Sequence, residues 1–177
     1  MTCPLDCEYL QDARRHDKPV PLASVKMPHE DIRVGEKFLR EHEELLQFLA
    51  GSLSAAALET SGAADFDVRD ALDAMIRTYR TLEAGVYYET LPPNALASRV
   101  CRTVRDDIAR FHLEERRELG IPKTRDTDIL GMLVFLARLE LDRNNGRRRG
   151  RAFIGLLREL APAPANPGGT DSRLVLP

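Results

Sequence analysis

Hydrophobic residues recur every three or four positions along most of the chain, a spacing that places them on one face of an α-helix. This pattern covers residues 32–57, 65–86 and 97–119. Asp65 or Asp67 can cap the second of these segments, because a short carboxylate side chain can accept from the free N–H groups of the first helical turn. The pattern therefore predicts three long amphipathic helices.

The segment 127–142 has a different pattern, because residues 129–136 are almost all apolar and show no polar side. A helix that is hydrophobic on every side must be surrounded by other helices. A shorter apolar run at 153–160 predicts one further helix. The sequence therefore predicts an all-α fold, a helical bundle of about five helices with a central buried helix and a short N-terminal arm.

Prolines and small residues mark the two ends of this predicted bundle. Residues 1–28 contain two cysteines and four prolines, and we interpret them as an N-terminal arm. Residues 29–161 hold the helical patterns and form the predicted bundle domain. Residues 162–177 are rich in proline, glycine and alanine, a composition typical of a disordered tail.

Charge and cysteine content limit the function classes. The 177 residues include 26 basic and 28 acidic side chains, so no overall charge attracts nucleic acid or anionic lipid. Three cysteines are an odd number and do not suggest the disulfide framework of a secreted domain. The first residues lack the basic and apolar regions of a secretory signal, and no apolar run approaches the roughly 20 residues that span a bilayer. We therefore expect a cytoplasmic protein with no membrane partner.

Cys3, Cys7 and His16 form the first candidate site. Thiolates and imidazoles are preferred zinc ligands, and the spacing of Cys3 and Cys7 lies within the range common in zinc sites. Two exposed thiols in the cytosol could also support redox chemistry. The alternative is structural, with Cys7 packing as a small apolar side chain and Cys3 exposed without a role. The sequence thus predicts zinc as the one candidate cofactor.

His42, Glu83 and His112 form the second candidate site, a pocket inside the bundle. His42 falls on an otherwise apolar stripe, and the other two lie near the inner sides of their predicted helices. A ferritin-like di-iron site is excluded because no glutamate stands three residues before any of the four histidines. The alternative is that His42 is a core histidine satisfied by one hydrogen bond to a tyrosine hydroxyl or a carboxylate.

The third candidate site is an arginine-rich loop before the last predicted helix, with Arg147, Arg148, Arg149 and Arg151. Arginines beside glycines and a helix N-terminus suit phosphate or carboxylate groups. The partner would be a nucleic acid, a nucleotide or an acidic protein surface. No aromatic residue interrupts the run, so a stacking surface for single strands is missing. The alternative is a solvated loop whose arginines pair with nearby acidic residues.

Several catalytic motifs are missing from the sequence. It contains no phosphate-binding loop of the Gly-x-x-x-x-Gly-Lys or Gly-x-Gly-x-x-Gly kind, and no Gly-x-Ser-x-Gly motif. Cys101 lies on an apolar stripe, which predicts a buried and inert thiol. We therefore predict a helical binding or scaffold protein, with a protein or a second copy of the chain as its partner. Zinc or thiol chemistry and binding of an anionic partner are the alternative functions.

Overall fold

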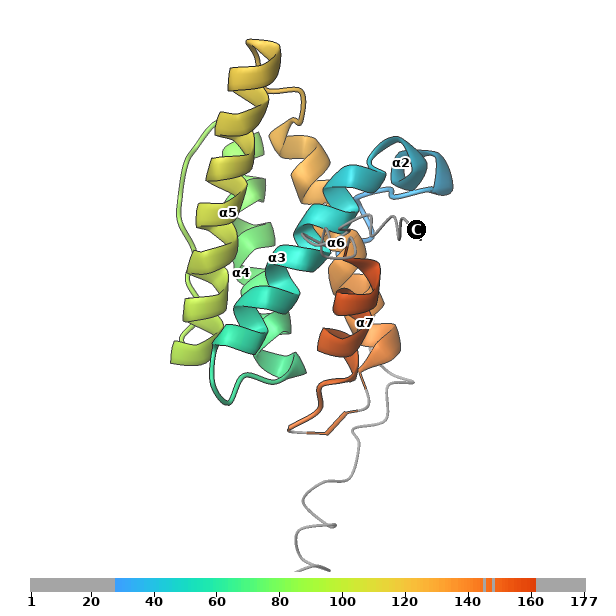
Figure 1. Ribbon diagram of the computed structural model, residues 1–177, viewed down its shortest axis with the longest axis vertical. Helices are drawn as coiled ribbons and strands as arrows, with labels where there is room; N and C mark the ends of the chain where they lie inside the picture. Colours follow the sequence, from blue (N-terminus) through green and yellow to red (C-terminus); the bar gives the residue numbers. More distant parts are fainter. Residues whose placement is uncertain (1–27, 145, 148, 162–177) are drawn as a thin grey trace, which may run out of the picture.

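A computed structural model describes residues 28–144, 146–147 and 149–161, and it is all-helical over these residues. The described helices are α2 (Glu36–Glu41), α3 (Glu43–Glu59), α4 (Asp65–Glu83), α5 (Ala95–Leu119), α6 (Asp126–Arg143) and α7 (Ala152–Leu160). They pack against one another as an all-α helical bundle, which confirms the predicted fold class (Figure 1). Among these helices, none combines the length and the apolar composition needed to cross a bilayer.

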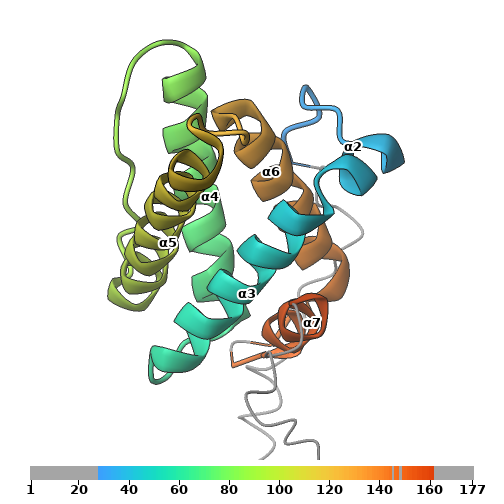
Figure 2. The same ribbon diagram turned by 45° about the horizontal axis from the view of Figure 1, so that its top comes forward.

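The bundle has two layers. In one layer α3 lies between α5 and α7 and contacts both, and in the other α4 and α6 pair along their lengths (Figures 1 and 2). The layers join mainly where α4 packs against α5 and where α3 crosses α6. This arrangement leaves α5 at one edge of the molecule, with one face on α4 and α3 and the rest open to solvent.

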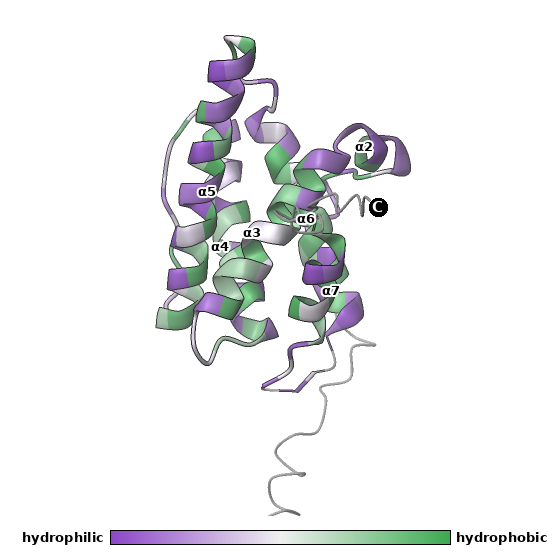
Figure 3. Ribbon diagram, viewed as in Figure 1, coloured by the Kyte–Doolittle hydropathy of each residue, from purple (hydrophilic) through white to green (hydrophobic). Residues whose placement is uncertain are grey.

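The core lies where α3, α4 and α6 meet. Leu49 and Leu53 of α3, Leu72 and Met75 of α4, and Leu133 of α6 are fully buried. Figure 3 marks the apolar and polar positions along each helix, and most of the buried positions are apolar. The apolar segment 129–137 is buried except for the half-buried Phe135, as its uninterrupted hydrophobicity predicts. Its helix packs mainly on α4 and also contacts α3 and α7.

The first predicted helix is divided in two at His42. This residue leaves the helical conformation, with φ −121° and ψ 32°, and it both ends α2 and precedes α3. The bend brings the ring of Phe38 in α2 onto Gly131 in α6, where a Cβ atom would lie 2.9 Å from the ring Cζ. Continuous hydrophobic spacing predicts one helix here, but the contact of Phe38 with Gly131 is a tertiary interaction that the spacing does not contain.

Asp65 and Asp67 have separate tasks at the start of α4. The N-cap is Ala64, so neither aspartate has the capping position that the sequence predicts. Asp67 instead lies in the first turn, where its carboxylate accepts the N–H of Ala64 at 2.8 Å. Asp65 is fully buried and instead accepts the N–H groups of Phe153 and Ile154, at 3.2 and 3.0 Å. The Asp67 carboxylate therefore stabilises the first turn of α4, and the Asp65 carboxylate links α4 to the N-terminus of α7.

Candidate functional site

A cleft between α4 and α5, with a volume of about 210 Å³, is lined by both apolar and polar side chains. We call it the Tyr79 cleft. Its lining residues come from α4, the connection between α4 and α5, α5 itself and the start of α6; they are Met75, Thr78, Tyr79, Leu82, Tyr87, Arg105, Ile108, Ala109, His112 and Asp126. The cleft is thus shared by three helices and one connecting segment.

Helical spacing explains how α4 and α5 present these residues. On α4, the lining residues recur at intervals of three and four from Met75 to Leu82, and on α5 they do so from Arg105 to His112. Such intervals place side chains on one face of a helix. Because α4 and α5 pack against each other, the two faces meet and form opposite walls of the cleft.

Several polar groups of the Tyr79 cleft have no partner within the part of the chain that the structure describes. The hydroxyls of Tyr79 and Tyr87 and the carboxylate of Asp126 form no hydrogen bond or ion pair there. The Nε2 atom of His112 is buried and also lacks a hydrogen-bond partner. Thr78 differs, because its hydroxyl donates to Ala74 O and accepts from the N–H of Thr90. Among these groups, the Nε2 atom of His112 is the one that is buried, and leaving a buried polar atom unpaired costs about 1–3 kcal/mol. Tyr87 and Asp126 are exposed, so their polar atoms can be hydrated.

The charged groups of the cleft are arranged asymmetrically. Arg105 forms an ion pair with Glu89, so its positive charge is balanced within the protein. Asp126 has no such counterion among the described residues. Burial raises the pKa of Tyr79 strongly, and the negative charge of Asp126 adds to the increase. Tyr79 therefore remains a neutral phenol at physiological pH, and its hydroxyl can donate a hydrogen bond.

The three residues of the predicted bundle pocket lie in different places. His112 lines the Tyr79 cleft, whereas His42 lines a separate cleft of about 140 Å³ at the start of α3 and α6. Glu83 is exposed at the end of α4 and lines neither cleft. Of the three, the structure thus places only His112 beside the unpartnered groups.

His42 is partly exposed and makes its hydrogen bond to a backbone carbonyl, not to the tyrosine hydroxyl or carboxylate of the alternative considered from the sequence. Its Nδ1 atom lies 2.9 Å from Phe38 O, and its Nε2 atom lies 3.6 Å from the carboxylate of Asp128. Its side chain is about 25% exposed and its ring stacks on Phe38, with 4.4 Å between ring centroids. One ring nitrogen thus lies beside a carbonyl and the other beside a carboxylate. These neighbours explain why a histidine stands at a position where the hydrophobic pattern predicts an apolar residue.

The arginine-rich loop is partly used for structure. The Nε atom of Arg151 donates to Ala63 O at 3.2 Å, while Arg147 and Arg149 are exposed and Arg148 lies outside the described residues. The N-terminus of α7, which the sequence offered to a phosphate, is occupied by the Asp65 carboxylate. Anion binding by this loop stays a prediction. The groups that would bind the anion are the exposed arginine side chains and not the N–H groups at the start of α7.

The predicted zinc or thiol site of Cys3, Cys7 and His16 lies outside the described residues and stays a prediction. Within the residues that are described, no group of three or more His, Cys, Asp or Glu side chains is placed to hold a metal ion. Cys101 is fully buried on α5, and burial raises the pKa of its thiol to about 11. Its thiolate is therefore scarce at neutral pH, in agreement with the prediction of an inert thiol.

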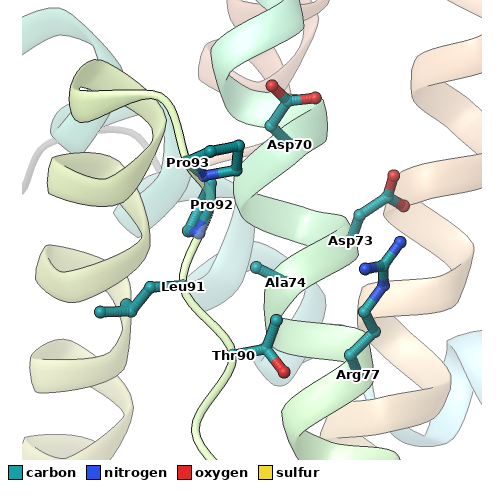
Figure 4. A pocket seen from close by; sticks show the side chains of 8 residues that line it. All are labelled: Asp70, Asp73, Ala74, Arg77, Thr90, Leu91, Pro92 and Pro93. Carbon is teal, nitrogen blue, oxygen red and sulfur yellow. The ribbon is translucent and has the colours of Figure 1, made fainter.

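A further cleft of about 190 Å³ lies where α4 faces the segment leading into α5. Figure 4 shows Asp70, Asp73 and Arg77 on α4, opposite Pro92 and Pro93. Burial raises the pKa of Asp70, and the neighbouring carboxylate of Asp73 acts in the same direction. None of the buried unpartnered atoms found in the described residues belongs to this cleft. It is therefore a weaker candidate than the Tyr79 cleft.

Comparison with known proteins adds no further constraint. No protein family matches the chain, and no curated protein or solved structure is significantly similar to it. The functional argument therefore rests on the geometry of the clefts.

Proposed function

We propose that this chain is a small-molecule-binding protein and that the Tyr79 cleft is its binding site. The observation that carries the proposal is the group of unpartnered polar atoms on Tyr79, Tyr87, His112 and Asp126. The proposal keeps the binding function predicted from the sequence, and it names a cleft where the sequence suggested a bundle surface.

The chemistry of the lining supports a ligand that has both polar and apolar parts. Met75, Leu82 and Ile108 offer apolar contact, while the two phenols, the imidazole and the carboxylate offer donors and acceptors. Binding sites typically combine a mostly apolar lining with a few convergent polar groups. At about 210 Å³, the cleft is smaller than the roughly 300–1,000 Å³ of sites for drug-sized ligands, which favours a smaller molecule.

Ala109 offers a way to test the proposal without disturbing the core. It lines the cleft from an exposed position on α5, so Ala109→Phe would fill the cleft from its open side. Asp106→Phe places the same side chain at an exposed position of α5 that does not line the cleft, and serves as the matched control.

The experiment is a fragment screen followed by amide NMR spectra. We expect hits to shift the amide signals of residues 75–82 and 105–112, Ala109→Phe to abolish these shifts, and Asp106→Phe to retain them. Hits that shift other regions, or that bind Ala109→Phe as well as they bind the original chain, would contradict a binding site in this cleft.

A protein partner is the second candidate function, favoured by apolar side chains at the end of α5. Leu113, Leu119 and Ile121 are exposed by 51%, 57% and 69%, and large exposed apolar side chains can take part in protein interaction surfaces. Sedimentation of the purified chain tests for a second copy as the partner. If Ile121→Asp leaves a concentration-dependent dimer unchanged, this end of α5 does not form the interface.

A further inference from the structure

We infer that the ligand of the Tyr79 cleft is a small organic cation, an ammonium group attached to a short apolar or aromatic body. This inference rests on the proposed function, because it assumes that the cleft binds a ligand, and it adds the ligand's charge and chemical class. It is carried by the carboxylate of Asp126, which forms no ion pair with the described residues, together with the two tyrosines that line the cleft.

The charge balance of the lining favours a cation. Arg105 and Asp126 are the two lining residues with formal charges, apart from the imidazole of His112. The guanidinium of Arg105 is already paired with Glu89, whereas the carboxylate of Asp126 has no described counterion. An ammonium group would complete the missing pair, and the exposure of Asp126 leaves room for it to approach.

The aromatic side chains of the cleft favour the same ligand class. The rings of Tyr79 and Tyr87 line the cleft, and aromatic faces attract ammonium groups through their negative quadrupole. Tyr87 is 62% exposed on the connection after α4, so its ring is accessible to a ligand that enters from solvent. Met75, Leu82 and Ile108 provide apolar surface for the body of the ligand.

An anionic ligand fits the cleft less well. Its only fixed cationic partner would be Arg105, whose guanidinium would have to exchange Glu89 for the ligand. The unpaired carboxylate of Asp126 would also repel it, since like charges at close range disfavour binding. Both effects lower the affinity for a carboxylate or phosphate ligand, and neither lowers the affinity for an ammonium ligand.

Three probes of nearly equal shape separate charge from shape: benzylammonium, benzyl alcohol and benzoate. Their affinities for the full chain are measured by calorimetry at pH 7 and low salt, and their sites by amide NMR. We expect benzylammonium to bind about threefold or more tightly than benzyl alcohol, and benzoate to bind most weakly, because one partly exposed charge pair contributes a factor of this size.

Asp126→Asn tests the residue that carries the inference. It should lower the affinity for benzylammonium about twofold to fivefold and change the affinity for benzyl alcohol by less than about twofold. Asp106→Asn removes an exposed carboxylate of α5 outside the cleft and should change neither affinity. Because Asp126 is the first residue of α6, Asp126→Glu is also measured; it keeps the charge and should retain the preference for benzylammonium.

The outcomes separate the two proposals. If benzoate binds most tightly, or if Asp126→Asn leaves benzylammonium affinity unchanged while the probes still bind in the cleft, the inferred cation is wrong and the binding site stands. If none of the three probes shifts the amide signals of the cleft, the inferred ligand class is overturned. A fragment screen that also finds no ligand for the cleft overturns the proposed function.

Discussion

Glu140 is a carboxylic acid without access to solvent, and replacing it with glutamine should change how the stability of the bundle depends on pH. It is fully buried on α6, and its Oε1 atom accepts a hydrogen bond from the side-chain amide of Asn144. Its Oε2 atom has no partner among the described residues. Burial raises the pKa of Glu140 from 4.5 to about 7, and the carboxylates of Asp65 and Asp73 add to the increase.

The direction of the effect follows from which state of the protein holds the proton. The folded chain keeps Glu140 neutral up to about pH 7, whereas the unfolded chain loses this proton near pH 4.5. The contribution to stability is therefore complete below pH 4.5 and is lost as the pH rises through 7. One pH unit of difference between the two pKa values corresponds to about 1.4 kcal/mol, so the whole loss is about 3 kcal/mol.

Glu140→Gln has nearly the same shape, cannot ionise, and still offers an oxygen to Asn144. Urea unfolding, with linear extrapolation to water, gives the unfolding free energies at pH 5 and pH 8. We expect the variant and the original chain to differ little at pH 5, and the variant to be more stable by up to about 3 kcal/mol at pH 8. Glu114→Gln, at an exposed position of α5, should show no such change. An equal stability difference at both pH values would refute the reasoning.

Three further substitutions test how the helices are held together. Asp65→Asn should lower the unfolding free energy by about 2 kcal/mol and speed amide hydrogen exchange in α7, because an amide has one acceptor oxygen for the two N–H groups. Unchanged exchange in α7 would contradict this role of Asp65. Gly131→Ala should lower the unfolding free energy despite the better helix propensity of alanine, because the added Cβ atom would meet the ring of Phe38. In a Phe38→Leu background the same substitution should become stabilising. Additive effects of the two substitutions in a double-mutant cycle would exclude the contact. Arg138→Met removes three hydrogen bonds to carbonyls of residues 28–32 and should speed amide exchange at Ile32, whereas unchanged exchange there would show that other contacts hold this turn.

The helices could be predicted from the sequence because their hydrophobic spacing is a local property. The end of α5 illustrates this, since Gly120 adopts φ 77° and stops the helix where the sequence indicates. The break at His42 could not be predicted in the same way. It accompanies the contact of Phe38 with Gly131, two residues that are far apart in the sequence and meet only in the folded chain.

The Tyr79 cleft could be predicted only in part for a related reason. Of the polar residues that line the cleft, His112 is a candidate from the sequence, because it lies near the inner side of its predicted helix. Arg105 and Asp126 resemble ordinary charged surface residues, and only the packing of α4, α5 and α6 brings them to one cleft. Sequence spacing identifies the face of a helix on which a residue lies, but it does not identify the neighbour of that face.

A positive charge introduced into the chain near Asp126 tests whether its carboxylate lacks an ion-pair partner. Ala109→Lys places an ammonium group on α5 at a position that lines the same cleft, and Ala109→Met gives an uncharged side chain of similar length. The two residues have similar helix propensities, so their difference in stability isolates the charge. The lysine variant should be more stable than the methionine variant by about 0.2–1 kcal/mol, the usual range for a partly exposed pair.

The same lysine should also reduce benzylammonium affinity more than the methionine does, because its ammonium would occupy the place of the ligand. Thermal unfolding and calorimetry of the two variants measure these effects. Functional sites often retain groups that stability alone would pair or remove. If the lysine gives no advantage in stability and both variants bind benzylammonium equally, Asp126 is an ordinary solvated carboxylate and the cleft has no unbalanced charge to recognise a cation.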